Sequence, residues 1–453
     1  MPAPRSRGHD TASRGCWWPA GTSTSLPFIA SLWGRPDPLI GALLSNGGAS
    51  QALPAEAERT EPPSEATDVV PSAAHALAGM AGVAALTFLV ARAIPGGYWV
   101  ALTGGVPLAR AGQRGGRDGY ATAGASLVET TAVMGPARLG IAVPHAASAP
   151  LLGVLDRRGA GYLTLAAAGA LVRYLYYLLT FAFYVWVLVG LDAYTGTYES
   201  ARDLLPFLPA GEAAAIWVTA VGLIFWSAGA GLIQAWVIRR GLRRWPEDAD
   251  VEVEVLDPER EPRADERERE RRGWDPRVVV TVATLLIALA LVSTAPLMLA
   301  VVAGLLAVLW ALSTAGLRPL AGGLALAAPL ALSTLAFGLV GGIGEAEALR
   351  RTARVALLVL IAVWLRAAAG PDGLREVSLR LVRRLPRVRT LALTAAVLGA
   401  SAGAADYGAS GRRLGARLRA TRKRPAPILD AVLLWIGNEA SQLPRGRSAA
   451  REP

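Results

Sequence analysis

The sequence predicts an all-α fold, that of a polytopic helical membrane protein, from three observations. Of the 453 residues, 53% are hydrophobic and 18% are charged, whereas about a quarter of the residues in soluble proteins are charged. The charges are clustered, so several apolar segments approach the length of about 20 residues that a transmembrane helix needs. Arginine clusters such as Arg239–Arg244 follow apolar segments, as the positive-inside rule predicts for cytoplasmic loops. We therefore expect a multi-pass protein of the inner cell membrane.

The composition divides the chain into four parts. Residues 1–72 are rich in Pro, Ser, Gly and Arg and predict a poorly ordered N-terminal extension. A first membrane helical block is expected at 73–245, and the charged stretch 246–274 predicts a solvated cytoplasmic linker. Residues 275–453 are expected to form a second membrane block that ends in a basic amphipathic region.

Apolar stretches of helical length predict the individual membrane segments. Leu391–Ala405 is the exception, because a crossing there would place the basic cluster Arg412–Arg424 outside the cell. The expected segments are Ala73–Ile94, Tyr98–Ala109, Tyr162–Leu191, Ala213–Ile238, Val278–Ala295, Leu297–Gly316, Pro319–Gly342 and Val355–Ala369.

Several functional classes are disfavoured by the residue inventory. The net charge of +11 is accounted for by cytoplasmic loops, so we expect no nucleic-acid partner. Cys16 is the single cysteine, and three histidines (His9, His75 and His145) are too scattered for a zinc site. The sequence has no P-loop, no Gly-x-Ser-x-Gly elbow and no His-Glu-x-x-His helix. We therefore expect no enzymatic activity and no cofactor.

Glu129, Arg138 and His145 lie in the half-apolar segment Gly124–Leu152 and are the candidate substrate-binding residues. Ionisable groups at membrane depth cost about 2.5–3.5 kcal/mol on insertion scales and mark functional sites by default. The alternative is that the segment is interfacial or a loop, so that its charges are simply hydrated. Arg173 lies in another apolar segment, and we expect its side chain to snorkel to the lipid headgroups.

The second block contains a series of short motifs between its apolar segments. Trp274–Arg277 precedes the first segment, Leu317–Pro319 forms a basic turn, and Leu357–Leu365 runs through a polar turn into the basic stretch Arg366–Leu385. From Asp275 to about Asn438 this order resembles the T component of energy-coupling factor transporters. The resemblance implies a membrane subunit that couples cytosolic ATPases to the uptake of a small solute.

The C-terminal basic stretch of the second block, Leu374–Arg424, predicts an amphipathic surface that either lies on the membrane or docks on a partner. The family seats short Ala-Arg-Gly-type motifs in its ATPases, and Gly415–Leu418 is the nearest counterpart here. The resemblance thus implies coupling residues, which are Arg412, Arg413, Arg417 and Arg419.

We therefore expect a transporter membrane subunit whose partners are cytosolic ATPase subunits and membrane lipid. The alternative is an integral membrane protein without a transport role, either a scaffold or an enzyme that acts on lipids. Genes for ATPase subunits beside this one would favour the first hypothesis, and genes for lipid or envelope enzymes the second.

The positive-inside rule gives a topology that can be tested directly. It predicts that the charged linker and the segment Arg375–Arg389 are both cytoplasmic. Cysteines introduced at Glu259 and Ser378 should therefore resist membrane-impermeant thiol reagents in intact cells and react after permeabilisation. Labelling of either cysteine in intact cells would overturn this orientation.

Overall fold

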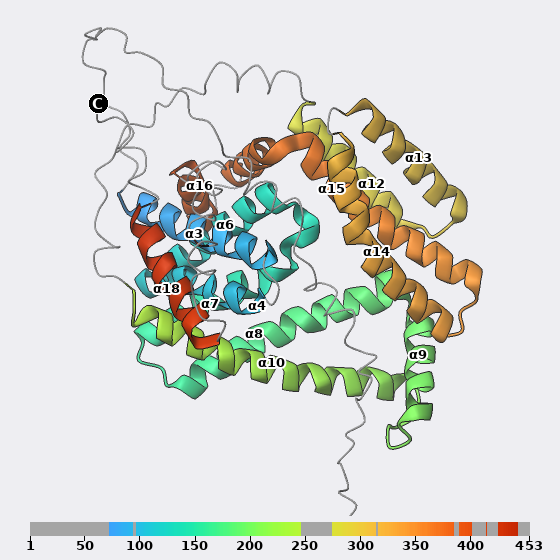
Figure 1. The fold of residues 1–453 in the computed structure, drawn as a ribbon, viewed down its shortest axis with the longest axis horizontal. Helices are drawn as coiled ribbons and strands as arrows, with labels where there is room; N and C mark the ends of the chain where they lie inside the picture. Colours follow the sequence, from blue (N-terminus) through green and yellow to red (C-terminus); the bar gives the residue numbers. More distant parts are fainter. Residues whose placement is uncertain are drawn as a thin grey trace, which may run out of the picture.

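The computed structural model describes residues 72–93, 97–245, 274–313, 316–384, 389–400, 414 and 425–442. These residues are almost entirely helical and contain no strand, which confirms the all-α prediction (Figure 1). The expected extension at 1–72, except Ser72, and most of the expected linker lie outside the described residues. Four described helical segments are long and apolar enough to cross a membrane, as a polytopic helical membrane protein requires: Tyr162–Val189, Glu212–Leu242, Leu317–Val340 and Glu345–Arg383.

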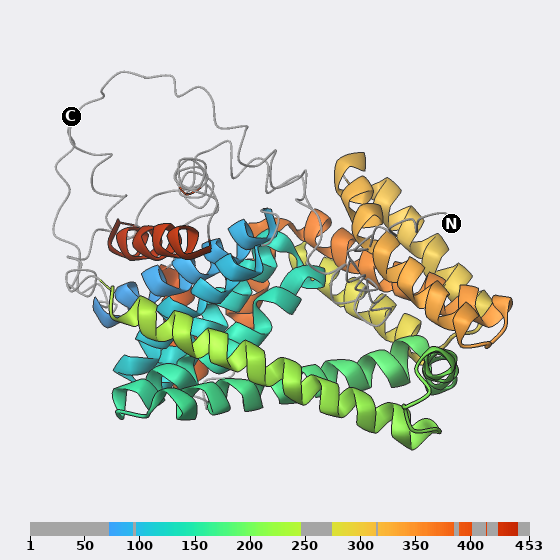
Figure 2. The same cartoon turned by 60° about the horizontal axis from the view of Figure 1, so that its bottom comes forward.

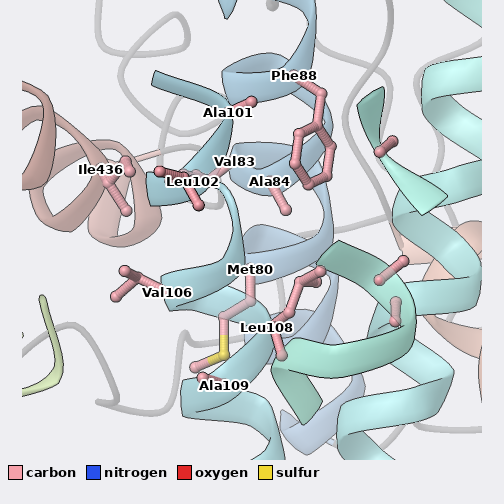
Figure 3. Close-up of a cluster of buried hydrophobic side chains, with 14 of the residues drawn as sticks. Met80, Val83, Ala84, Phe88, Ala101, Leu102, Val106, Leu108, Ala109 and Ile436 are labelled. Atoms are coloured by element: carbon pink, nitrogen blue, oxygen red, sulfur yellow. The ribbon is translucent and has the colours of Figure 1, made fainter. Parts of the chain in front are cut away.

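The first block begins with a bundle of short helices around a dense apolar core. Figure 3 shows part of this core, where Met80 lies near Leu108 and Ala109, and Leu102 lies toward Ile436 of a C-terminal helix. Close approach of α5 and α7 depends on glycine, since a Cβ at Gly153 would overlap the carbonyl group of Ala109. The bundle consists of α3 (Ser72–Ala93), α4 (Tyr98–Thr103), α5 (Gly105–Arg114), α6 (Gly116–Met134), the 3₁₀ helix η1 (Pro136–Ile141) and α7 (Val143–Arg157).

Two C-terminal helices complete the core of this first bundle. Helix α16 (Arg389–Ala400) packs on α3 and α6, and α18 (Pro425–Gln442) packs on α3 and α4. Trp435 and Ile436 are buried in the same apolar cluster as the first helices. Figure 2 shows α18 lying across the helices of the bundle. The two hydrophobic blocks of the sequence are therefore interleaved in space.

Two long helices extend away from the bundle side by side (Figures 1 and 2). Helix α8 (Tyr162–Ala182) continues as the π-helical segment η2 (Phe183–Val189), and α10 (Glu212–Leu242) runs along it. Their backbones are close, because a Cβ at Gly231 would lie 2.5 Å from the carbonyl oxygen of Ala166. Small residues permit this kind of packing between membrane helices. The outer faces carry exposed large apolar side chains: Leu163, Leu179, Trp186, Trp217 and Phe225.

The second bundle contains α12 (Pro276–Val292), α13 (Pro296–Leu312), α14 (Leu317–Val340) and α15 (Glu345–Arg383). Asp275 caps α12, since its carboxylate accepts a hydrogen bond of 2.9 Å from the Arg277 amide. Trp364 is fully buried in the apolar cluster between these helices. Gly370 has a φ of 68° and divides α15 into two helical arms, so the predicted polar turn before the basic stretch is present as a kink.

The short helix α9 (Leu191–Leu204) connects the far end of the long helices to the second bundle. The Thr197 hydroxyl donates to the Phe337 carbonyl oxygen of α14 at 3.0 Å. The Arg351 guanidinium of α15 contacts the Asp192 carboxylate at 2.9 Å and lowers the pKa of Asp192 through this hydrogen bond. The second bundle thus contacts η2 and α9 at the far end of the long helices. Through α15 it also contacts the first bundle.

Close packing of α5 against α7 leads to a stability prediction. Gly153→Ala places a methyl group against the Ala109 backbone, and overpacking of this kind costs typically about 1–3 kcal/mol. We expect a loss near 3 kcal/mol in the free energy of unfolding, measured by denaturant titration in detergent. Gly304→Ala on α13 is the matched control, because nothing lies within 4 Å of its Cβ position. Equal stability of the two variants would contradict this account of the packing.

Candidate functional site

The three residues singled out in Gly124–Leu152 occupy three different elements with different surroundings. Glu129 on α6 is buried, and its carboxylate lies 3.0 Å from the Arg375 guanidinium. Arg138 on η1 lines a cleft between the two bundles. His145 on α7 is buried and contacts Arg173. The hydrated-loop alternative is therefore wrong for Glu129 and His145, which lie inside the helical bundle.

Arg173 is the centre of a buried polar cluster that joins three helices. Its guanidinium donates through Nε to the Gln234 side-chain oxygen on α10 at 2.8 Å and through Nη2 to His145 Nδ1 at 3.1 Å. The Gln234 amide nitrogen donates in turn to the Ser148 hydroxyl at 2.8 Å. Arg173 is 0% exposed. The expectation that it snorkels to the headgroups is wrong, because it lies mid-helix on the face of α8 that packs on α7 and α10.

The hydrogen bonds fix the protonation of His145. A guanidinium has donors and no acceptor, so His145 Nδ1 must accept the hydrogen bond from Arg173. The imidazole is then neutral and carries its proton on Nε2. Within the described part of the chain, neither His145 Nε2 nor Arg173 Nη1 has a hydrogen-bond partner, although both atoms are buried. The cluster therefore has a surplus of donors.

The charge of the cluster, like its surplus of hydrogen-bond donors, favours an anionic acceptor. Arg173 carries a full positive charge, and no described carboxylate forms an ion pair with it. An isolated charge in a low-dielectric interior is costly unless it is paired. An acceptor that bears negative charge would satisfy the free N–H groups and compensate the cation together. Chemically, the arrangement suits a carboxylate or a similar anionic oxygen.

Small residues and one aromatic ring position the side chains of the cluster by packing. A Cβ at Gly169 would lie 3.5 Å from the Gln234 side-chain oxygen, so the absence of a side chain there lets α8 and α10 approach. Phe88 of α3 stacks on the His145 ring with centroids 5.7 Å apart. Gly104 leaves room for the Phe88 ring, because a Cβ there would lie 2.7 Å from it. Packing thus holds the imidazole beside Arg173.

A second basic feature lies between the two bundles. A cleft of about 60 Å³ is bordered by α3, α6 and η1 on one side and by α14 and α15 on the other. Arg138 and Arg366 both line it. Arg366 donates through Nε to the Val133 carbonyl oxygen at 3.0 Å. The sequence did not single out Arg366 as a binding residue, although an arginine near the end of an apolar segment was the available signal.

The expected coupling residues cannot be placed in the structure. Arg412, Arg413, Arg417 and Arg419, the expected coupling residues, lie outside the described residues. Among the residues that are described, no group of three or more His, Cys, Asp or Glu side chains could hold a metal ion. Comparison with protein-family models, curated proteins and solved structures finds no match for this chain.

The buried contact between Glu129 and Arg375 yields a prediction about stability. Breaking a buried ion pair by removing one partner costs about 3–5 kcal/mol. Because Arg375 remains partly exposed, we expect Glu129→Ala to lower the free energy of unfolding by about 3 kcal/mol. A double-mutant cycle with Arg375→Ala, measured by denaturant titration, should show a coupling of at least about 1 kcal/mol. Additive effects of the two substitutions would show that the pair contributes no coupling.

Proposed function

We propose that this chain is an integral membrane subunit of a transporter, and that the Arg173 cluster contacts the transported solute. The observation that carries the proposal is the buried guanidinium of Arg173, whose described partners are all neutral. Ionisable residues inside membrane helices are expensive and are kept where they face a substrate or ion pathway. Two of the four helical segments that can span a membrane, Tyr162–Val189 and Glu212–Leu242, contribute Arg173 and Gln234 to this feature.

The chemistry of the cluster supports an anionic solute. Arg173 Nη1 and His145 Nε2 are unsatisfied donors, and a carboxylate accepts several hydrogen bonds at once. The Phe88 ring and the neighbouring alanines make the surroundings apolar. A small organic anion with an apolar body fits these properties better than an inorganic ion.

Coupling to cytosolic ATPase subunits is the second half of the proposal. The second block resembles the T component of energy-coupling factor transporters, and the chain contains no P-loop of its own. The first part of the basic stretch, residues 371–383, packs on the first bundle, where Arg375 contacts Glu129. Movement of this stretch by a partner would therefore be felt by α6. The expected contact residues are the arginines at 412–419.

The experiment has two readouts. Affinity purification from mild detergent shows whether ATPase subunits co-purify with the chain. Untargeted mass spectrometry of a defined medium shows which solute the cells deplete, and so measures uptake. Arg173→Gln should keep the ATPase subunits bound and reduce uptake by about 10- to 150-fold, because a hydrogen bond to a charged group contributes about 1.5–3 kcal/mol. Ser227→Ala on α10 is its control, since that buried hydroxyl makes no hydrogen bond to described residues.

The same experiment separates the site from the coupling surface. Arg417→Glu should release the ATPase subunits, whereas Arg389→Glu should have little effect, because docking depends on particular positions and adhesion to lipid does not. If no ATPase co-purifies with the unmodified chain, the coupling role is overturned. Normal uptake by Arg173→Gln would remove the proposed solute site.

A further inference from the structure

The cleft between the bundles lies where helices end. Arg366 is four residues before the kink at Gly370 in α15, and Pro319 and Gly322 belong to the first turns of α14. On the opposite wall, Gly135 marks the end of α6 and Arg138 lies on η1. Ends of apolar membrane helices lie near the headgroup region. The cleft is therefore placed at the depth of lipid headgroups rather than at the centre of the bilayer.

The lining combines two cations with apolar groups. Arg138 and Arg366 are the charged members, and none of the described residues that line the cleft is a carboxylate. The hydrogen bond of Arg366 Nε to Val133 leaves its two terminal nitrogens for a ligand, since a guanidinium carries five N–H donors. Guanidinium groups bind phosphate in a bidentate fashion. The remaining lining includes Leu89, Leu326 and Val363, so the ligand needs an apolar part as well.

Glycine provides the room in this cleft. Gly135 has a φ of 84°, a conformation that side-chain-bearing residues rarely adopt, and its Cβ position would lie 3.2 Å from Arg366 Cβ. Gly323 allows α14 to approach α15, because a Cβ there would lie 3.1 Å from Val363. The Gly135 backbone thus lies against the aliphatic stem of Arg366, while Gly323 lets α14 and α15 pack closely beside the cleft.

Helix α14, which forms part of one wall of the cleft, also carries exposed apolar residues that do not line the cleft. Leu324 and Leu332 of α14 are exposed large apolar residues, as expected of a helix face in contact with acyl chains. Under the orientation predicted from the basic clusters, the start of α14 and the kink of α15 are on the cytoplasmic side. Anionic lipids are concentrated in that leaflet, and basic pockets between helices bind their headgroups.

We propose that the cleft between the two bundles binds the phosphate headgroup of one anionic phospholipid through Arg138 and Arg366, with an acyl chain along α14. The ligand comes from the bilayer, since the cleft lies near helix ends and its lining combines two guanidinium groups with apolar side chains. The bound lipid bridges α6 and η1 of the first bundle to α14 and α15 of the second. It is independent of the solute site at Arg173.

The test is native mass spectrometry on delipidated protein in detergent, after addition of phosphatidylglycerol or phosphatidylcholine. The unmodified chain should retain one phosphatidylglycerol and no phosphatidylcholine at matched concentrations. Arg366→Gln should weaken phosphatidylglycerol retention at least tenfold. The matched control is Arg354→Gln on the same helix, because Arg354 likewise donates to a backbone carbonyl, that of Leu291, at 3.0 Å but does not line the cleft.

Additional measurements distinguish a lipid site from a site for free phosphate. Inorganic phosphate added at the lipid concentration should not displace phosphatidylglycerol, and displacement would indicate a site for the free ion instead. If Arg366→Gln does not fold, Arg138→Gln on the opposite wall carries the same comparison. Equal retention by Arg366→Gln and Arg354→Gln, or equal retention of the two lipids by the unmodified chain, would overturn the proposal.

Discussion

The hydrogen bond between Arg173 and Gln234 is the interaction on which the rest of the first block depends. It joins α8 to α10 in a region where both helices are otherwise apolar. A polar side chain that lost its partner there would have to be buried unsatisfied, at a cost of several kcal/mol. This pair therefore fixes the register of the two long helices together with the hydrogen bond of 2.8 Å that the Tyr162 hydroxyl donates to the Leu232 carbonyl oxygen. His145 and Ser148 extend the same constraint to α7.

Glycine and alanine make this arrangement geometrically attainable. Gly169 and Gly231 bring α8 and α10 together near the polar cluster, while Gly112 and Gly153 bring α5 and α7 together beside it. Between membrane helices the gain comes from close van der Waals contact, since lipid tails are as apolar as the side chains they replace. The result is a tightly packed first bundle from which α8 and α10 extend, with their outer apolar faces available to lipid.

Much of the fold was predictable because membrane helices leave a long, simple signal. The segment formed by α8 and η2, and the helices α10 and α14, were expected within a few residues of their observed ends, and Asp275 with Pro276 marks the start of α12. The packing of α16 and α18 on the first bundle was not foreseen. Hydropathy indicates which segments are long and apolar enough to lie in lipid. It does not indicate which distant segments a given helix will contact.

The candidate site was predictable in part. His145 was identified as an ionisable group in a membrane-related segment, and Arg173 was noticed but assigned to the headgroups. Side-chain length allows an arginine to snorkel, so sequence position alone cannot distinguish an outward from an inward face. Gln234 went unnoticed because an amide near the arginines of Arg239–Arg244 looks like the polar end of a span. Arg366 acquires its environment from residues more than 200 positions away, at Val133.

The contribution of α18 to the first core has a consequence for biogenesis. Leu102 and Ile436 belong to one apolar cluster, yet they are 334 residues apart in the chain, which at about 5–20 residues per second is tens of seconds of synthesis. During that interval the helices α3 to α7 have been made while their apolar partner has not. The core of the first bundle is complete only once α18 has added Trp435 and Ile436 to it, and Arg240 then pairs with Asp430 of α18 at 3.0 Å. Insertion and final packing of this chain are thus separate events in time, and an incomplete translation product lacks the sealed core of its own N-terminal half.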